Sequence, residues 1–251
     1  MKHVDLPKFP TRHGYMSERT QQNYIAVSSE NGLMPKDAHR IAELVSLTAS
    51  SDTTKPIQFW QLYSVLGQDP IVGIVERFYT RVFEQEDWFK SVFERVGGIN
   101  HHINTQASMW IDVMGGGPYY HGAEYRLSFH HHHNALQLMN EKGAELWSKL
   151  MLETLEASGD LMTDDPRVRI SINTFLAYFM GKYADEFAFE NRSYFGETNG
   201  PFKRKINLMR LSAAQIEALS EDELGEALSD RGVDLSQYAN KAAKVNKALM
   251  L

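Results

Sequence analysis

Residues 114–147 read MGGGPYYHGAEYRLSFHHHHNALQLMNEKGAELW and carry the most informative pattern of the chain. Three glycines and a proline end one helix, a polar loop follows, and four consecutive histidines occupy positions 130–133. The last of them opens the pattern His133-x-x-Leu136-x-Leu138, and a helix that bears Trp147 begins shortly afterwards. The segment therefore places several imidazoles next to an apolar wall and a large aromatic side chain.

This combination suits a metal-bearing cofactor. Histidine is the commonest protein ligand for iron and other borderline metals, because neutral imidazole offers a nitrogen lone pair at neutral pH. An apolar wall beside it is what a flat, apolar cofactor requires. We therefore interpret the segment as one side of a haem pocket, with His133 as the metal ligand and His131 or His132 as alternatives. Without that wall, four histidines in a row would usually form a solvated loop or an adventitious metal site.

Composition limits the classes of protein. The chain has 251 residues, of which 43% are hydrophobic, an ordinary share for a globular protein. Its formal net charge of −6 argues against nucleic-acid binding. The absence of cysteine excludes disulfides, thiolate catalysis and iron–sulfur clusters. No apolar run has the length of a signal-peptide core or a membrane span, so we expect a cytoplasmic protein that binds no membrane.

The composition divides the chain into three parts. Residues 1–56 form a polar N-terminal extension with one short helix near Ile41–Leu47 and a linker at 50–56. Residues 57–189 hold most of the aromatic residues and the strong helical periodicity. Residues 190–251 form an acidic, helical C-terminal extension. This division predicts that residues 57–189 contain everything the central fold needs.

The C-terminal extension is expected to contain two short helices. Ser212 and Ser220 could cap them, and Gly232 could end the second. We expect this part to pack as a capping hairpin. Its alternative role is to dock a reductase or another protein partner.

Apolar spacing predicts four helices in the central part. They cover residues 69–82, 100–114, 140–157 and 165–183. Asp69 and Asp165 are expected to cap the first and the last, because each is followed by a proline. No alternating pattern indicates a strand, so the predicted core is all-α.

This layout resembles that of the truncated (2/2) haemoglobins. Arg77-Phe78-Tyr79 resembles a motif of the family's helix B, whose tyrosine lies in the distal pocket. Phe93 falls where the family has an aromatic residue that packs on haem. The pattern that starts at His133 resembles the proximal signature, and Trp147 resembles the tryptophan that begins helix G. The resemblance implies an all-α, globin-like fold (a 2/2 helical sandwich) with additional flanking helices.

The resemblance also implies a cofactor, haem (iron protoporphyrin IX), and roles for named residues. Tyr79, His102 and Gln106 would face the gas ligand. The residues expected to contact the cofactor itself are Phe93, Met109, Leu136, Leu138 and Trp147.

Two registers stay open. One frame of the helix at 100–114 directs His102 and Gln106 into the pocket, and the other directs Ile103 and Ala107 there. We prefer the first, because a four-residue step aims two hydrogen-bonding groups at one face. On the proximal side, the interval from His133 to Trp147 is one residue longer than the family usually shows. His131 is the main rival, with Arg126-Leu127 ahead of it at about the family's distance.

Such a pocket predicts a haem protein that binds dioxygen or nitric oxide. Several hydrogen-bond donors around the ligand would favour slow release and redox chemistry, either nitric oxide dioxygenase or peroxidase-type activity of an oxidoreductase. The alternative is a cofactor-free, all-α interaction or adaptor protein. Under that alternative, Tyr79 and Trp147 would be ordinary core residues.

Overall fold

The computed structural model describes residues 46–85, 87–117, 120, 129–200, 206, 208 and 211–251. They form two compact units: of the described residues, the first contains 55–200 and the second contains 46–54 together with 206, 208 and 211–251. Described parts of the two predicted extensions thus contribute to one unit, a grouping that differs from the three-part division. The predicted helix near Ile41–Leu47 lies almost entirely outside the described residues, as do Arg126-Leu127.

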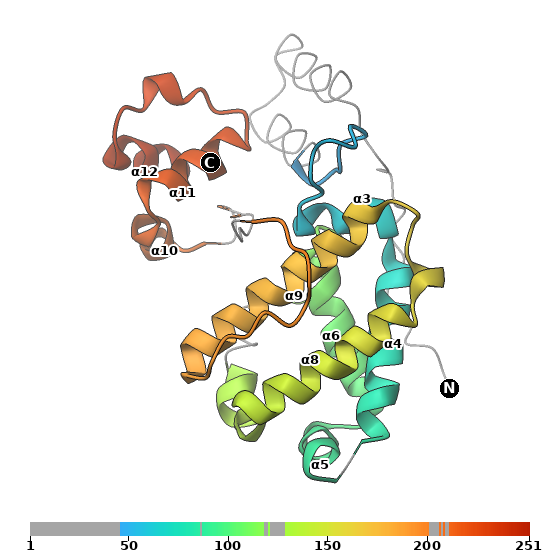
Figure 1. Ribbon diagram of the computed structural model, residues 1–251. Coiled ribbons are helices and arrows are strands. Elements are labelled where there is room, and N and C mark those ends of the chain that lie inside the picture. Colours follow the sequence, from blue (N-terminus) through green and yellow to red (C-terminus); the bar gives the residue numbers. More distant parts are fainter. Residues whose placement is uncertain are drawn as a thin grey trace. The chain divides into compact units, whose positions relative to one another are not determined.

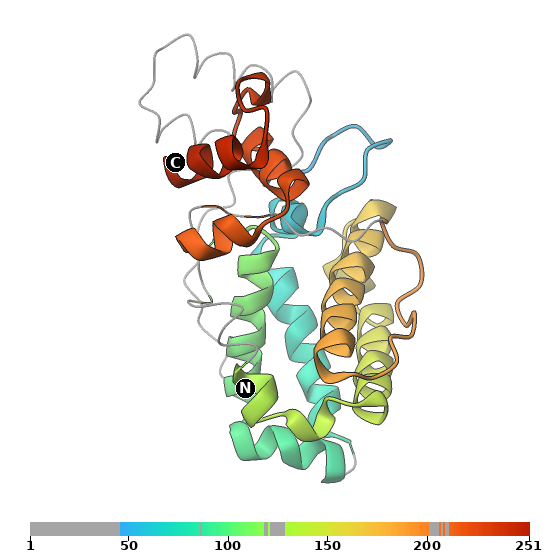
Figure 2. The same ribbon diagram turned by 90° about the vertical axis from the view of Figure 1, so that its left-hand side faces the viewer.

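Helices build the first unit, and the described residues contain no β-strand, which confirms the all-α prediction. Its elements are η1 (Phe59–Gln61), α3 (Leu62–Leu66), α4 (Gln68–Phe83), α5 (Asp87–Val96), α6 (Ile99–Val113), η2 (Leu136–Leu138), α8 (Glu141–Glu156), η3 (Gly159–Leu161) and α9 (Pro166–Phe187). Helix α4 packs against both α6 and α8. Helix α9 runs alongside α8 in both views (Figures 1 and 2), so we describe α4 with α6 and α8 with α9 as two helix pairs. None of the described helices is long and apolar enough to cross a membrane.

Local sequence explains where these helices begin. The Asp165 side chain accepts a hydrogen bond from the backbone N–H of Arg167, and the following proline opens α9, as predicted. The Asn140 side chain caps α8 in the same way. In contrast, α4 starts after Gly67, whose φ of +72° suits glycine, so Asp69 lies in the first turn and is not the cap. A carboxylate in that position still complements the helix dipole.

Helix α5 was not among the four predicted helices. It has 10 residues, and it buries Phe89, Val92 and Phe93. Phe89, Val92, Phe93 and Val96 stand at the spacing i, i+3, i+4 and i+7, so the sequence does contain a helical stripe here. The prediction assigned a role to Phe93 and overlooked the short helix that carries it.

Aromatic pairs connect the two helix pairs. The rings of Phe78 on α4 and Trp147 on α8 lie 5.0 Å apart between centroids. Trp110 on α6 and Phe175 on α9 lie at the same centroid distance, in an edge-to-face arrangement. Such contacts add about 0.5–1.5 kcal/mol each beyond the burial of their surface. Phe78, Trp110 and Phe175 are also among the most deeply buried side chains, so they fix the spacing of the helices.

The first unit extends past the predicted boundary at residue 189. Phe195 is only 2% exposed, and its ring packs 6.5 Å from that of Trp147. The Asn199 backbone N–H donates to Thr174 Oγ1 at 2.8 Å, and its side-chain Nδ2 donates to the carbonyl of Ile57 at 3.1 Å. These contacts hold the segment after α9 against the helices.

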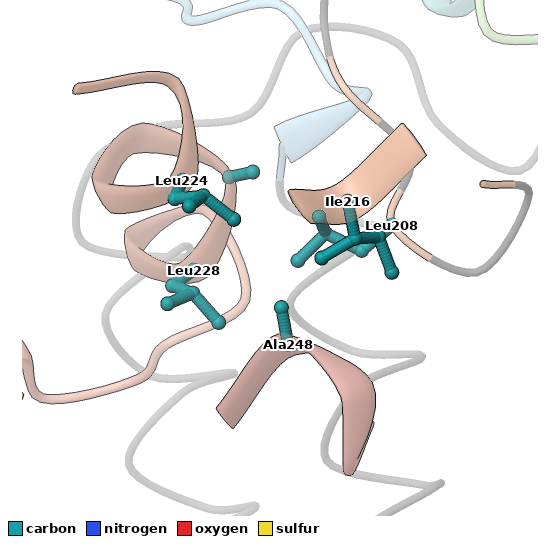
Figure 3. Close-up of a cluster of buried hydrophobic side chains, with 6 residues drawn as sticks. Leu208, Ile216, Leu224, Leu228 and Ala248 are labelled. Atoms are coloured by element: carbon teal, nitrogen blue, oxygen red, sulfur yellow. The ribbon is translucent and has the colours of Figure 1, made fainter. Parts of the chain in front are cut away.

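The second unit is a small helical module. Its described elements are α10 (Ala213–Ala218), α11 (Glu221–Ser229), η5 (Leu235–Gln237) and α12 (Lys241–Leu249). Ser212 and Ser220 form capping boxes, and Gly232 follows α11 with φ +72°, as predicted, whereas α12 was not predicted. Its core, drawn in Figure 3, consists of Leu208, Ile216, Leu224, Ala227, Leu228 and Ala248.

The contacts of Phe195 and Asn199 lead to a prediction about trimming. A chain of residues 57–189 should unfold at a lower temperature than one of residues 55–203, because removing a buried phenylalanine side chain typically costs about 3–5 kcal/mol. Circular dichroism during heating measures both. Phe195→Ala in the full chain should lower the melting temperature in the same direction. Equal melting temperatures of the two trimmed chains would show that the segment after α9 does not stabilise the fold.

Candidate cofactor pocket

A cavity of about 130 Å³ that opens to solvent lies inside the first unit. Sites for drug- or cofactor-sized molecules typically measure about 300–1000 Å³, so a ligand of that size requires the lining side chains to move apart. Among the described residues that line it there is no aspartate, glutamate, lysine or arginine. The walls are therefore mainly apolar, and their polarity comes from histidine, tyrosine, threonine and glutamine side chains.

Most of the residues predicted for the site line this cavity. They are Tyr79, Phe93, His102, Gln106, Met109, His131, Leu138 and Trp147. Leu136 is an exception, because its side chain is 54% exposed and lies outside the lining. Leu136 and Leu138 stand two residues apart in the 3₁₀ turn η2, so they point to different sides of a helix with three residues per turn. The prediction for Leu136 is not met by this geometry.

The four histidines face in different directions. His131 is 9% exposed and lines the cavity, and the half-buried His130 also lines it. His132 is exposed, with Nε2 2.8 Å from Oε1 of Glu186. His133 is exposed as well: Nδ1 donates to the carbonyl of Phe129 at 2.9 Å, and its ring stacks on that phenylalanine. The structure thus brings the alternative ligand His131 to the cavity, and it does not bring His133 or His132 there.

The surroundings of His131 keep its imidazole neutral. Burial lowers the pKa of His131 to about 3, and nearby His130, His132 and Lys182 act in the same direction. Its Nδ1 is buried without a hydrogen-bond partner, and the ring packs edge to face on Tyr183 at 4.4 Å. A neutral imidazole with a lone pair, in an apolar cavity, fits an iron-bearing haem.

A second polar group comes from α4 and α6. Tyr79 is buried, and its hydroxyl donates to Oε1 of Gln106 at 3.3 Å. Burial raises the pKa of Tyr79, so the hydroxyl stays protonated at neutral pH. The cavity therefore contains a permanent hydrogen-bond donor that a neighbouring amide orients.

His102 is oriented by the backbone. Its Nε2–H donates to the carbonyl of Phe93 at 2.7 Å, while the ring stacks on Tyr79. Burial lowers the pKa of His102, although the bond to Phe93 opposes this shift. Both His102 and Gln106 line the cavity, and neither Ile103 nor Ala107 does. The geometry agrees with the preferred frame of this helix.

Sequence reasoning did not identify two tyrosines as site residues. Tyr120 is buried and lines the cavity, and Tyr183 on α9 lines it beside His131. The apolar stripe of the fourth predicted helix already included Tyr183, so a signal for its burial existed. Tyr120 follows a Gly-Pro turn, and no periodic pattern could have placed it.

A pocket between two helix pairs, with a histidine inside, is the arrangement of a globin. Residues 61–180 match the family model of bacterial-like globins. The match covers 120 of the 251 residues, and it confirms the predicted resemblance to truncated haemoglobins. Globins bind haem, so the match assigns haem-based gas binding to the segment in general terms.

Plant proteins are among the similar relatives. The chain is 26% identical over 120 residues to two-on-two hemoglobin-3 of Arabidopsis thaliana, a match that covers 47% of this chain and 67% of the relative. It is 28% identical over 122 residues to group 2 truncated hemoglobin 3-1 of Lotus japonicus, covering 47% and 70% respectively. No solved structure matches the chain significantly.

The burial of His131 predicts how acid affects the protein without cofactor. The folded-state pKa of about 3 lies below the ordinary value of 6.5. Between these values the unfolded chain binds a proton that the folded chain does not, so the free energy of unfolding falls as the pH decreases from 6.5 toward 3. Denaturant titrations at about pH 7 and about pH 4.5 should therefore show a smaller loss for His131→Phe than for the wild type. His133→Phe, a matched control, should keep the wild-type loss, and identical losses in all three proteins would contradict the assignment.

Proposed function

We propose that the cavity holds haem with His131 as the iron ligand, and that the protein binds dioxygen and nitric oxide there. The observation that carries this proposal is the neutral, buried imidazole of His131 in a mainly apolar cavity, with a side-chain nitrogen that has no hydrogen-bond partner. Haem iron with an imidazole ligand supplies an open coordination position for a diatomic gas and exchanges electrons. His133, the ligand that the sequence pattern favours, stays an alternative to be tested.

Tyr79 is the proposed donor to the gas ligand. A dioxygen ligand held at such a site would carry partial negative charge, which the O–H of Tyr79 would stabilise. The Tyr79 hydroxyl is protonated and lies in a cavity with few competing polar groups, where a hydrogen bond is stronger than in water. The hydroxyl has a single proton, which Oε1 of Gln106 accepts over a long 3.3 Å, so donation to the gas ligand requires the hydroxyl to turn from Gln106 toward that ligand.

The hydrogen bond of His102 helps to decide between peroxidase and nitric oxide dioxygenase activity. Cleavage of a peroxide is assisted by a histidine that can take up and return a proton. Since Nε2 of His102 already donates to the Phe93 carbonyl, this imidazole is poorly placed for such a role. Conversion of nitric oxide and dioxygen to nitrate consumes one electron and no proton, so it needs no acid–base residue. We therefore favour nitric oxide dioxygenase activity over peroxidase activity.

That reaction needs a source of electrons. The predicted reductase partner at the C-terminal extension remains part of this proposal. The first turn of α11 presents Glu221, Asp222 and Glu223, all exposed, which would suit a basic face on such a partner. Reduction assays at low and high salt test this part, because screening weakens contacts between exposed charges.

Replacement of single histidines tests the proposed ligand. His131→Ala should fail to bind haem stably in a reconstitution titration, whereas His133→Ala should bind one equivalent with a wild-type ferrous spectrum. The reason is that His131 lines the cavity, whereas His133 does not. The opposite result, with haem lost from His133→Ala and kept by His131→Ala, would show that His133 is the iron ligand, as the sequence pattern favours.

Tyr79→Phe should speed dioxygen release. Loss of a hydrogen bond worth about 1.4 kcal/mol corresponds to about a tenfold faster off-rate, measurable by stopped-flow or flash photolysis. Tyr178→Phe, on α9 and outside the cavity lining, is the matched control and should leave the rate unchanged. We expect His102→Leu to have a smaller effect than Tyr79→Phe, because its Nε2 is engaged by the backbone. An off-rate unaltered by Tyr79→Phe would exclude Tyr79 as the donor.

A further inference from the structure

The turn that carries His131 is held by one face of α9. Tyr183 lies 4.4 Å from the His131 ring, and Phe187 lies 4.6 Å from the His132 ring. Oε1 of Glu186 lies 2.8 Å from Nε2 of His132. Positions 183, 186 and 187 are three and four residues apart, so they share one side of the helix. We name Tyr183, Glu186 and Phe187 the α9 face.

The His131 ring is held differently from the ring of most metal-ligating histidines. A metal-ligating histidine normally donates its second ring N–H to a carboxylate or a carbonyl, and that bond fixes the orientation of the ring. Nδ1 of His131 is buried and has no such partner. Its contacts include the rings of Tyr183 and Phe187, the second at 6.4 Å and nearly perpendicular. Packing therefore has to supply the orientation that a hydrogen bond supplies elsewhere.

We propose that the α9 face positions the His131 imidazole for the iron: Tyr183 and Phe187 fix the plane of the ring by packing, and Glu186 holds the turn through His132. This inference rests on the proposed function, in which His131 is the ligand. Within it, the α9 face consists of positioning residues, and none of the three binds the metal. The Tyr183 ring matters more than its hydroxyl, because the ring is what contacts the imidazole.

Spectroscopy of the haem-loaded full chain tests the role of Tyr183. In Tyr183→Leu the iron–imidazole stretching band of the ferrous protein should shift or broaden in resonance Raman spectra, because the ring is no longer held in one orientation. Haem transfer to an acceptor apoprotein should become about 10–100-fold faster, as is typical when the support of a metal ligand is removed. Tyr183→Phe keeps the ring and should restore both the wild-type band and the wild-type transfer rate.

The other members of the face give independent variants. Phe187→Leu should shift the band in the same way as Tyr183→Leu. It provides a second test of the positioning role if Tyr183→Leu does not fold. Glu186→Leu should have a smaller effect, because a partly exposed contact between a histidine and a carboxylate contributes little to stability. Tyr178→Leu is the matched control: it removes the same side chain from the same helix outside the cavity lining. It should leave the band unchanged even if it lowers the melting temperature.

The outcomes separate this inference from the proposed function. If Tyr183→Leu and Phe187→Leu keep the wild-type band and transfer rate while His131→Ala loses haem, the positioning role is refuted and the ligand assignment stands. If His131→Ala binds haem like the wild type, the proposed function itself fails. A band that moves equally in Tyr178→Leu would show a general packing effect and would also overturn the inference.

Discussion

Burial of a neutral imidazole inside an apolar cavity is the constraint on which the rest of this account depends. An ionised His131 would be costly in that environment, so the ring stays neutral and its lone pair is free for a metal. The cavity itself exists because aromatic pairs hold the α4–α6 and α8–α9 pairs at a fixed spacing. Tyr79 and Gln106 then place a hydrogen-bond donor in the same space. Packing, electrostatics and the proposed gas chemistry follow from one arrangement.

The sequence was sufficient to predict the main helices. Long apolar stripes and the Asp165-Pro166 start determine α9, and the same kind of pattern determines α4, α6 and α8. The stripe of α5 at Phe89, Val92, Phe93 and Val96 has the same spacing, but it is short and was overlooked. The sequence was insufficient for the segment after α9, which is polar apart from residues such as Phe195, so tertiary contacts like that with Trp147 are needed to show that it belongs to the first unit. The joining of both flanks into one unit likewise depends on contacts between distant parts of the chain.

The sequence was sufficient to predict which region forms the candidate site, but not which histidine of the run at 130–133 faces the cavity. Residues on long helices, such as Tyr79 and Gln106, reach the cavity as expected, because a helix of regular period fixes their direction. In the run of four histidines, each step of one residue turns the side chain by about 100°. Composition is identical at all four positions, so only burial at the cavity and the contact with Tyr183 distinguish His131. Leu136 was misplaced because residues two positions apart in the 3₁₀ turn lie on different sides of it, so Leu136 and Leu138 do not both face the cavity.

The most direct test of the central claim is the absorbance spectrum of the purified full chain. After reconstitution with haem and reduction, the account predicts a Soret band that shifts when carbon monoxide is added, with one haem bound per chain. A chain that shows no Soret band after reconstitution would contradict it. The cavity would then be part of a cofactor-free helical protein, the adaptor that the composition alone also allows.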